Sequence, residues 1–161
     1  MNMKFYLKPV LSVIMLAILL GYAGCGGKKE PGPSEEQKAL DALSATWKVA
    51  GTNTDVTLDG VSKKADYASF TLTLTGTAGA TSYGYTTSGR PALSPWPSSG
   101  SWKFGDVIAT DVIRDPGTPK EVTGVHYSVS GDNLELTFQY DQAGESRTER
   151  VTGVWVFRLS K

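Results

Sequence analysis

Few side chains in this sequence could do acid–base chemistry. His126 is the one histidine of the 161 residues, and its place opposite the apolar side chains of a predicted strand indicates a surface residue. No Gly-x-Ser-x-Gly motif is present to supply a nucleophilic serine. Asp106, Asp111 and Asp115 are spaced about four residues apart, so two of them could form the carboxylate pair of a glycosidase. Aspartates beside Gly or Pro are more commonly turn caps.

Metal and phosphate chemistry have equally little basis. One His and one Cys fall short of the ligand set of a protein zinc site. No glycine-rich loop precedes a predicted helix in the phosphate-binding pattern. The charged run at residues 145–150 fits a solvated hairpin end whose charges pair among themselves. We therefore predict a protein that is not an enzyme and has no metal or cofactor.

Cys25, the one cysteine of the chain, is the residue whose sequence context best predicts a chemical role. Lys4 and Lys8 form a short basic start, residues 10–20 are apolar apart from Ser12, and small residues precede the cysteine. A basic start, an apolar run and small residues at the end describe an export signal. The apolar run is shorter than the roughly 20 residues of a membrane-spanning helix, so we predict a signal peptide over residues 1–24.

The residues Tyr22-Ala-Gly-Cys25 resemble the lipobox of bacterial lipoproteins. Ala23, Gly24 and Cys25 match that pattern, and Tyr22 stands where a Leu is usual. The resemblance implies that the Cys25 thiol receives a diacylglycerol, that cleavage makes Cys25 the N-terminus, and that palmitate-type chains complete the anchor. Several acyl chains hold a protein firmly where one binds only marginally. The alternative is a secreted protein with one free thiol, which is a liability in an oxidising compartment.

The lipoprotein resemblance also bears on location and partners. Gly and Pro dominate residues 26–34, and with Cys25 they predict a lipidated flexible tether over 25–34. Gly26 is not the Asp that retains some lipoproteins in the inner membrane, so we expect the outer membrane of the cell envelope, with the face left open. Without residues 1–24 the chain has 14 basic and 16 acidic side chains. That balance gives no excess of basic residues for binding nucleic acid. We expect a monomer.

The rest of the chain predicts one helix followed by strands. Ser34 and Gln37 form a candidate capping box, and Leu40 and Leu43 continue an apolar stripe, so a helix is expected over residues 35–43. Alternation of apolar and polar residues, as in Phe70–Thr75, then predicts half-buried antiparallel strands. The predicted strands are 46–51, 54–58, 68–75, 82–87, 101–104, 108–114, 121–130, 134–141 and 147–159, the last bent near Gly153.

Sequential hairpins of this kind predict an all-β fold, an up-and-down antiparallel barrel of about eight strands with one short N-terminal helix. A sandwich is the alternative closure, but a barrel removes exposed edges. The barrel domain would span residues 35–161, which is one domain by length. A membrane-spanning barrel is disfavoured, because its strands need about 9–11 residues and a lipid-facing apolar band.

Tryptophans near strand starts sharpen this prediction. Trp102 and Trp155 follow a Gly by two residues, as Trp47 follows Ala45; core packing is the ordinary explanation. The helix, the Trp of the first strand, the meander and Arg158 in the last strand resemble the lipocalin-like lipoproteins of bacteria. That resemblance covers residues 35–161, although Ala45 stands where lipocalins have Gly. It implies that Arg158 packs over Trp47 at the closed end of the barrel as a cation–π pair.

The inward faces of the strands supply the candidate ligand-binding residues. Trp96 joins them from the irregular segment 91–100, because a Trp between two prolines cannot sit in a central strand. That segment is either a gate at the barrel mouth or a plug packed on the core. The candidate residues are Phe70, Leu72, Leu74, Tyr83, Tyr85, Trp96, Trp102, Phe104, Tyr127, Leu136, Phe138 and Trp155.

Two functions remain open from the sequence. The first is a lipid-anchored lipocalin-like barrel that binds a small apolar or amphipathic ligand. The second is a packed β module that docks an envelope protein or a glycan. An open cavity of about 300 Å³ or more would favour the ligand-binding barrel. A filled interior with an exposed aromatic patch, for instance at Trp96, would favour the interaction module.

Overall fold

The computed structural model describes residues 32–141 and 151–161. Pro33–Lys161 form one compact unit, and every helix and strand described below lies in it. The predicted signal peptide, Cys25 and most of the tether lie outside the described residues, as does the charged run at 145–150. Export, lipidation and anchoring therefore stay predictions.

Helix α2 (Glu35–Leu43) has the predicted bounds. The Ser34 hydroxyl accepts a hydrogen bond from the Gln37 backbone N–H at 3.1 Å, which satisfies one of the free donors of the first turn. The Gln37 side chain bonds forward to Asp41 instead of back to the cap, so half of the capping box forms. The apolar stripe ends in Leu40 and Leu43, both of which are buried in the core.

Ten strands follow the helix within the described residues. Their bounds are β1 (Thr46–Lys48), β2 (Asp55–Leu58), β3 (Val61–Ser62), β4 (Thr71–Thr75), β5 (Tyr83–Ser88), β6 (Ser99–Phe104), β7 (Asp111–Arg114), β8 (Val122–Ser130), β9 (Asn133–Tyr140) and β10 (Gly153–Ser160).

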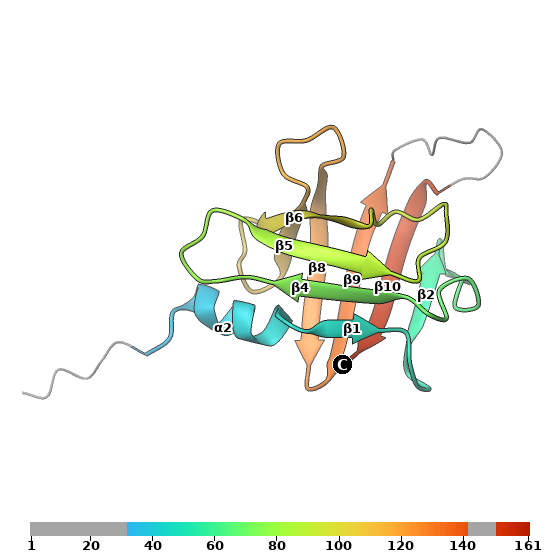
Figure 1. The fold of residues 1–161 in the computed structure, drawn as a ribbon, viewed down its shortest axis with the longest axis horizontal. Helices are drawn as coiled ribbons and strands as arrows, with labels where there is room; N and C mark the ends of the chain where they lie inside the picture. The colour runs from blue at the N-terminus through green and yellow to red at the C-terminus, as the bar shows by residue number, and fades with distance from the viewer. Residues whose placement is uncertain (1–31, 142–150) are drawn as a thin grey trace, which may run out of the picture. The chain divides into compact units, whose positions relative to one another are not determined.

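The strands form one closed antiparallel barrel. From β4 to β10 each strand pairs with the next, and β1 pairs with both β4 and β10. This ring has eight strands, and the β2–β3 hairpin extends it beside β10. Figure 1 shows β1, β4 and β5 crossing in front of β8, β9 and β10. The predicted all-β, lipocalin-like barrel is confirmed, and closure as a barrel excludes the sandwich.

Strand boundaries differ from the prediction mainly at the turns. The sequence did not predict the short strand β3, which follows a turn at Asp59 and Gly60. Both turn residues have positive φ, 50° and 80°, as a two-residue hairpin requires. Strand β7 starts at Asp111 rather than at residue 108, because the Asp111 N–H bonds back to the Val107 carbonyl in a turn. Strand β6 starts two residues earlier than predicted.

The alternation predicted from the sequence places the core inside the barrel. In β10 Trp155, Phe157 and Leu159 are buried while Val154 and Arg158 are exposed. The rings of Phe138 and Phe157 stack at 6.0 Å between centroids across neighbouring strands. A continuous aromatic cluster therefore fills the barrel, and it positions the residues at both ends.

Candidate functional site

Helix α2 closes one end of the barrel, which we call the helix end. Leu43 lines the innermost cavity beside Trp102 and Leu136, so the helix contributes directly to the lumen. The Trp47 indole donates a hydrogen bond to the Leu43 carbonyl at 2.9 Å. This contact satisfies the one polar atom of a completely buried Trp side chain.

The predicted pairing of Arg158 with Trp47 is wrong. Arg158 lies on the outer face of β10, exposed, with its Nε 2.8 Å from a carboxylate oxygen of Glu135. Alternation is the physical reason, because Arg158 and the buried Phe157 point to opposite faces. The cation over Trp47 is Lys161, whose Nζ lies 5.1 Å from the ring centroid. A Trp–cation pair therefore does exist at the helix end, with a different residue.

Glu36 fastens the helix to the loop between β4 and β5. Its carboxylate accepts a hydrogen bond from the Tyr83 hydroxyl and another, at 2.9 Å, from the Gly79 N–H. The Tyr83 bond is the main reason that the pKa of Glu36 is lowered from 4.5. Burial, and then the Glu36 contact, raise the pKa of Tyr83 to about 12. The polar groups at the helix end are therefore matched to one another.

The opposite end, the mouth end, is closed by residues 91–98, which we call the plug segment. Trp96 is 3% exposed, and its ring meets those of Tyr85 and Phe138 edge-on at 5.2 and 5.9 Å between centroids. The plug interpretation of this segment is confirmed, and Trp96 offers no exposed aromatic patch. A loop side chain thus fills the part of the lumen that the strands leave open.

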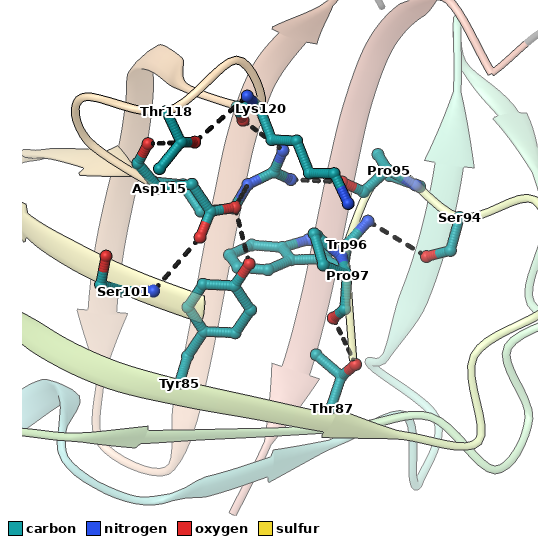
Figure 2. Close-up of polar contacts among 11 residues, drawn as sticks. Tyr85, Thr87, Ser94, Pro95, Trp96, Pro97, Ser101, Asp115, Thr118 and Lys120 are labelled. Atoms are coloured by element: carbon teal, nitrogen blue, oxygen red, sulfur yellow. Dashed lines mark hydrogen bonds and ion pairs between the residues drawn. The ribbon is translucent and has the colours of Figure 1, made fainter. Parts of the chain in front are cut away.

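Hydrogen bonds from the barrel hold the plug segment in place (Figure 2). The Thr87 hydroxyl donates to the Pro97 carbonyl at 2.7 Å, and the Tyr67 hydroxyl donates to the Ser94 hydroxyl at 3.2 Å. A guanidinium N–H of Arg114 donates to the Pro95 carbonyl. Three prolines already restrict the backbone of this segment, so few contacts are needed to order it.

Arg114 is a buried charged residue that was not among the site residues predicted from the sequence. It is 1% exposed, and its Nε lies 3.2 Å from Asp115 Oδ2. The guanidinium also lies 5.2 Å from the centroid of the Trp96 ring. The missed signal was the alternation of Val112 with Arg114, which places both on the inner face of β7; a charged residue is expected outside.

Asp115 is enclosed by donors from two other strands, as Figure 2 shows. It accepts hydrogen bonds from the Tyr85 hydroxyl at 2.8 Å and from the Ser101 N–H at 3.2 Å. Burial, reinforced by the Asp115 carboxylate, raises the pKa of Tyr85. Asp115 has a positive φ of 53° in its turn, so it is also the turn residue that the sequence predicts.

Two donors of this cluster are left without a hydrogen-bond acceptor among the described residues. They are Trp96 Nε1 and Arg114 Nε, and both are buried. Arg114 Nε is within ion-pair distance of Asp115 but is not aligned for a hydrogen bond. A buried unsatisfied donor costs about 1–3 kcal/mol, so the mouth end is less completely satisfied than the helix end.

The candidate ligand residues fill the barrel with one another. Of the twelve, eleven are buried and Phe104 is half-buried. The cavity among Leu74, Trp102, Tyr127 and their neighbours has about 10 Å³, the room of about one water molecule. A ligand-binding role for these residues stays a prediction, and inside the lumen the packing leaves no space for a ligand beside them.

A larger pocket, the mouth pocket, opens against the first residues of the plug segment. Its volume is about 470 Å³. The lining residues are Leu58, Lys63, Asp66, Tyr67, Pro91, Ala92, Leu93, Val151 and Trp155. Trp155 alone belongs to the predicted ligand set. Leu58 ends β2 and Val151 precedes β10, while the others lie in the segments after β3 and β5, where alternation makes no prediction.

The wall of the mouth pocket is rigid at its base. The Tyr67 ring meets those of Trp155 and Phe157 edge-on at 5.9 and 5.5 Å, and the Trp155 indole donates to the Val151 carbonyl at 2.7 Å. Burial raises the pKa of Tyr67 to about 12, so its hydroxyl is neutral and stays a hydrogen-bond donor. Lys63 is half-buried and Asp66 exposed at the pocket edge.

The other candidate chemical groups lie apart from this pocket. His126 is exposed, with Nδ1 2.7 Å from Asp111 Oδ1 on the neighbouring strand. Asp111 and Asp115 therefore have separate partners rather than facing each other as a hydrolytic pair. Across residues 32–141 and 151–161, no group of three or more His, Cys, Asp or Glu side chains is placed to hold a metal ion.

Comparison with protein-family models, curated proteins and solved structures finds no match to this chain. Among the helices of the described ranges, none is long and apolar enough to cross a membrane. Within the described residues, the fold and the site together define a closed all-β barrel with a filled lumen and a pocket beside the plug segment.

Proposed function

We propose that this chain is a lipid-anchored envelope protein that binds a small amphipathic ligand in the mouth pocket and catalyses no reaction. The observation that supports binding at this place is the contrast in free volume, about 470 Å³ at the mouth against about 10 Å³ in the lumen. Ligand pockets commonly have about 300–1,000 Å³. The proposed ligand therefore sits outside the plug segment rather than inside the barrel.

The lining of the pocket supports an amphipathic ligand. Leu58, Pro91 and Leu93 offer half-buried apolar surface, while Lys63 and Asp66 place charge at the edge. The lining thus combines apolar and charged side chains, which an amphipathic ligand can match with its two parts. The fixed rings at the base reduce the ordering cost of binding, because less of the wall must be immobilised.

The anchor rests on the sequence around Cys25, which lies outside the described residues. The expected result of Cys25→Ser in the full chain is an uncleaved precursor without acyl chains, seen by intact mass spectrometry of membrane and soluble fractions. A variant that is still cleaved and acylated would show that the lipobox interpretation is wrong. The ligand-binding part of the proposal does not depend on this result.

The packed interaction module remains the second candidate, because the lumen is filled as that function requires. Its other requirement, an exposed aromatic patch at Trp96, is not met, since Trp96 is buried. The large exposed apolar side chains of the described residues are Val61, Val107 and Val154, none of them aromatic. The mouth pocket is therefore the better supported site.

Native mass spectrometry tests the binding proposal directly. Pro33–Lys161 contains the complete barrel, and it would be purified from its host without detergent and then incubated with host lipid extract. We expect an added mass that disappears on denaturation. The variant Ala92→Trp, which fills the pocket edge, should lose that mass, whereas Val107→Trp, exposed away from the pocket lining, should keep it. A clean apo mass in every condition would favour the interaction module.

A further inference from the structure

The two charged side chains of the mouth pocket have opposite signs and no ion pair with each other. Lys63 and Asp66 both line the pocket, yet the ion pairs of the described residues include neither of them. Neither side chain has a hydrogen-bond partner in the described part of the chain, although the Asp66 N–H bonds to the Lys63 carbonyl. The turn thus fixes their backbones and leaves both charges available to a ligand.

Lys64, the next residue in the same turn, differs from Lys63 because its ammonium group has a hydrogen-bond partner. The Lys64 ammonium donates to the Gly51 carbonyl at 3.0 Å and does not line the pocket. Lys63 is half-buried, and it is the lysine that lines the cavity. Long cationic side chains commonly cover apolar surface while their charge stays in water.

The Asp66 carboxylate acts electrostatically on Tyr67, which lines the pocket. Its charge is one of the causes that raise the pKa of Tyr67, after the larger effect of burial, and Arg90 acts in the opposite direction. The pocket therefore presents apolar side chains together with an ammonium group and a carboxylate that have no ion pair among the described residues. A ligand with one charge satisfies only one of them, while a ligand with both charges satisfies the pair.

We propose that the mouth pocket selects a zwitterionic ligand with an apolar body, of the type of a short apolar peptide with free termini. The ligand carboxylate lies at Lys63, the ligand ammonium lies at Asp66, and the apolar side chains lie against Leu58, Leu93 and the Trp155 edge. This assignment rests on the proposed function, because it names the chemical class that the same pocket takes.

A charge-matched series of one dipeptide tests the assignment on Pro33–Lys161. The four ligands are Phe-Leu with free ends, its N-acetyl form, its C-terminal amide, and the form blocked at both ends. Calorimetry gives the dissociation constants, and the indole N–H resonance of Trp155 reports whether binding is at the pocket, with Trp47 at the helix end as the reference signal. We expect each blocked end to weaken binding roughly threefold to tenfold, the worth of one hydrogen bond.

Two variants assign the charges separately. Lys63→Gln should weaken only the ligands with a free carboxylate, and Asp66→Asn only those with a free ammonium group. Lys64→Gln is the matched control and should leave all four dissociation constants unchanged. Urea unfolding of each variant checks that the barrel is intact, which we expect because neither pocket side chain bonds to the described fold. A short-chain phosphatidylcholine below its micelle concentration distinguishes a phosphate from a carboxylate as the anionic group.

The outcomes separate this assignment from the proposed function. Tightest binding of the free dipeptide, with losses divided between the two variants as described, supports the zwitterion assignment. Equal binding of all four forms overturns it and leaves an amphipathic pocket that does not recognise charge. Binding of none of them, while host lipid extract still adds a mass that Ala92→Trp abolishes, also overturns the assignment alone. Failure of both experiments overturns the proposed function as well.

Discussion

The two ends of the barrel are closed by different means. At the helix end, α2 places Leu40 and Leu43 on the core, and the Trp47 indole finds an acceptor in the Leu43 carbonyl. At the mouth end, a proline-rich loop places Trp96 in the lumen above a buried Arg114–Asp115 pair. There two N–H donors have no acceptor among the described residues, and the mouth pocket opens beside the loop.

Because of this difference, the two ends should respond differently to substitution. Apolar packing at the helix end tolerates variation in detail, because dispersion and burial have no strict geometry. A buried charge pair depends on every partner, since loss of one leaves the other uncompensated. The mouth end is therefore the specific and sensitive part of the structure, and it is also where the ligand site is proposed.

The largest effect is expected from the buried charge pair. Arg114→Met keeps much of the side-chain volume but leaves Asp115 without its cation, and the free energy of unfolding should fall by about 3–5 kcal/mol at pH 7. Urea denaturation of Pro33–Lys161 measures it. Arg158→Met removes the exposed partner of Glu135 and should cost less than about 1 kcal/mol. Equal losses in the two variants would contradict the special role of the mouth end.

A glycine beneath the charge pair should give the next largest effect. A Cβ at Gly100 would overlap Asp115 Oδ1 and would also reach the Tyr85 ring, and both groups are held by hydrogen bonds. Gly100→Ala should therefore lower the free energy of unfolding by about 1–3 kcal/mol, as overpacking does.

The matched control for this glycine is Gly84→Ala in the neighbouring strand. There the nearest atom to a new Cβ is the exposed Thr75 hydroxyl oxygen at 3.2 Å, whose hydrogen bond to the Gly84 carbonyl water can replace. We expect no loss of stability at this site, because Ala in a strand restricts the unfolded chain more than Gly does. A Gly100 variant as stable as the Gly84 variant would mean that the Asp115 network is looser than its contacts indicate.

The sequence predicted the helix end better than the mouth end, for a physical reason. Helix α2 and strands such as β4 follow from local signals, a cap and an alternation of apolar residues, which act within a few positions. Arg114 and Asp115 are partnered by Tyr85, Ser101 and the plug segment, all distant in sequence. Alternation along β7 places Arg114 on the inner face, against the general rule that charged residues lie outside.

Two site assignments made from the sequence were wrong or incomplete, for different reasons. Arg158 was paired with Trp47 through a family resemblance, although alternation along β10 already opposed it. The mouth pocket was missed because Lys63, Asp66 and Leu93 lie in turns, where no periodicity links them. Their meeting depends on the closure of the barrel, which brings the turns after β3 and β5 together.

A pair of tryptophan variants sharpens the comparison between the ends. Each ring carries a cation at a similar distance, 5.1 Å for Trp47 and 5.2 Å for Trp96. Only the Trp47 N–H has an acceptor, the Leu43 carbonyl. Trp47→Phe should therefore cost about 1 kcal/mol more than Trp96→Phe, the net worth of one buried hydrogen bond. A larger loss for Trp96→Phe, measured by urea unfolding, would contradict this ranking.

The smallest effect concerns acid sensitivity, which should belong to the helix end. The pKa of Glu36 is lowered from 4.5 by the Tyr83 and Gly79 hydrogen bonds, so the folded state binds this proton less readily than the unfolded chain. The stability from Glu36 is thus fully present above pH 4.5 and is lost as the pH falls through the lower folded value. Glu36→Gln should remove this component and flatten the decline in stability as the pH falls below 4.5.

The neighbouring variant Glu35→Gln is the control for this titration. It leaves the bonds to Tyr83 and Gly79 intact, so its acid decline should match that of the parent chain. The indole N–H signals of Trp47 and Trp155 report the two ends separately during the titration. Because Glu36 fastens α2 to the barrel, the Trp47 signal should change first on acidification. If Trp155 changes first, acid acts on the mouth end, and the helix end is then the more robust of the two closures.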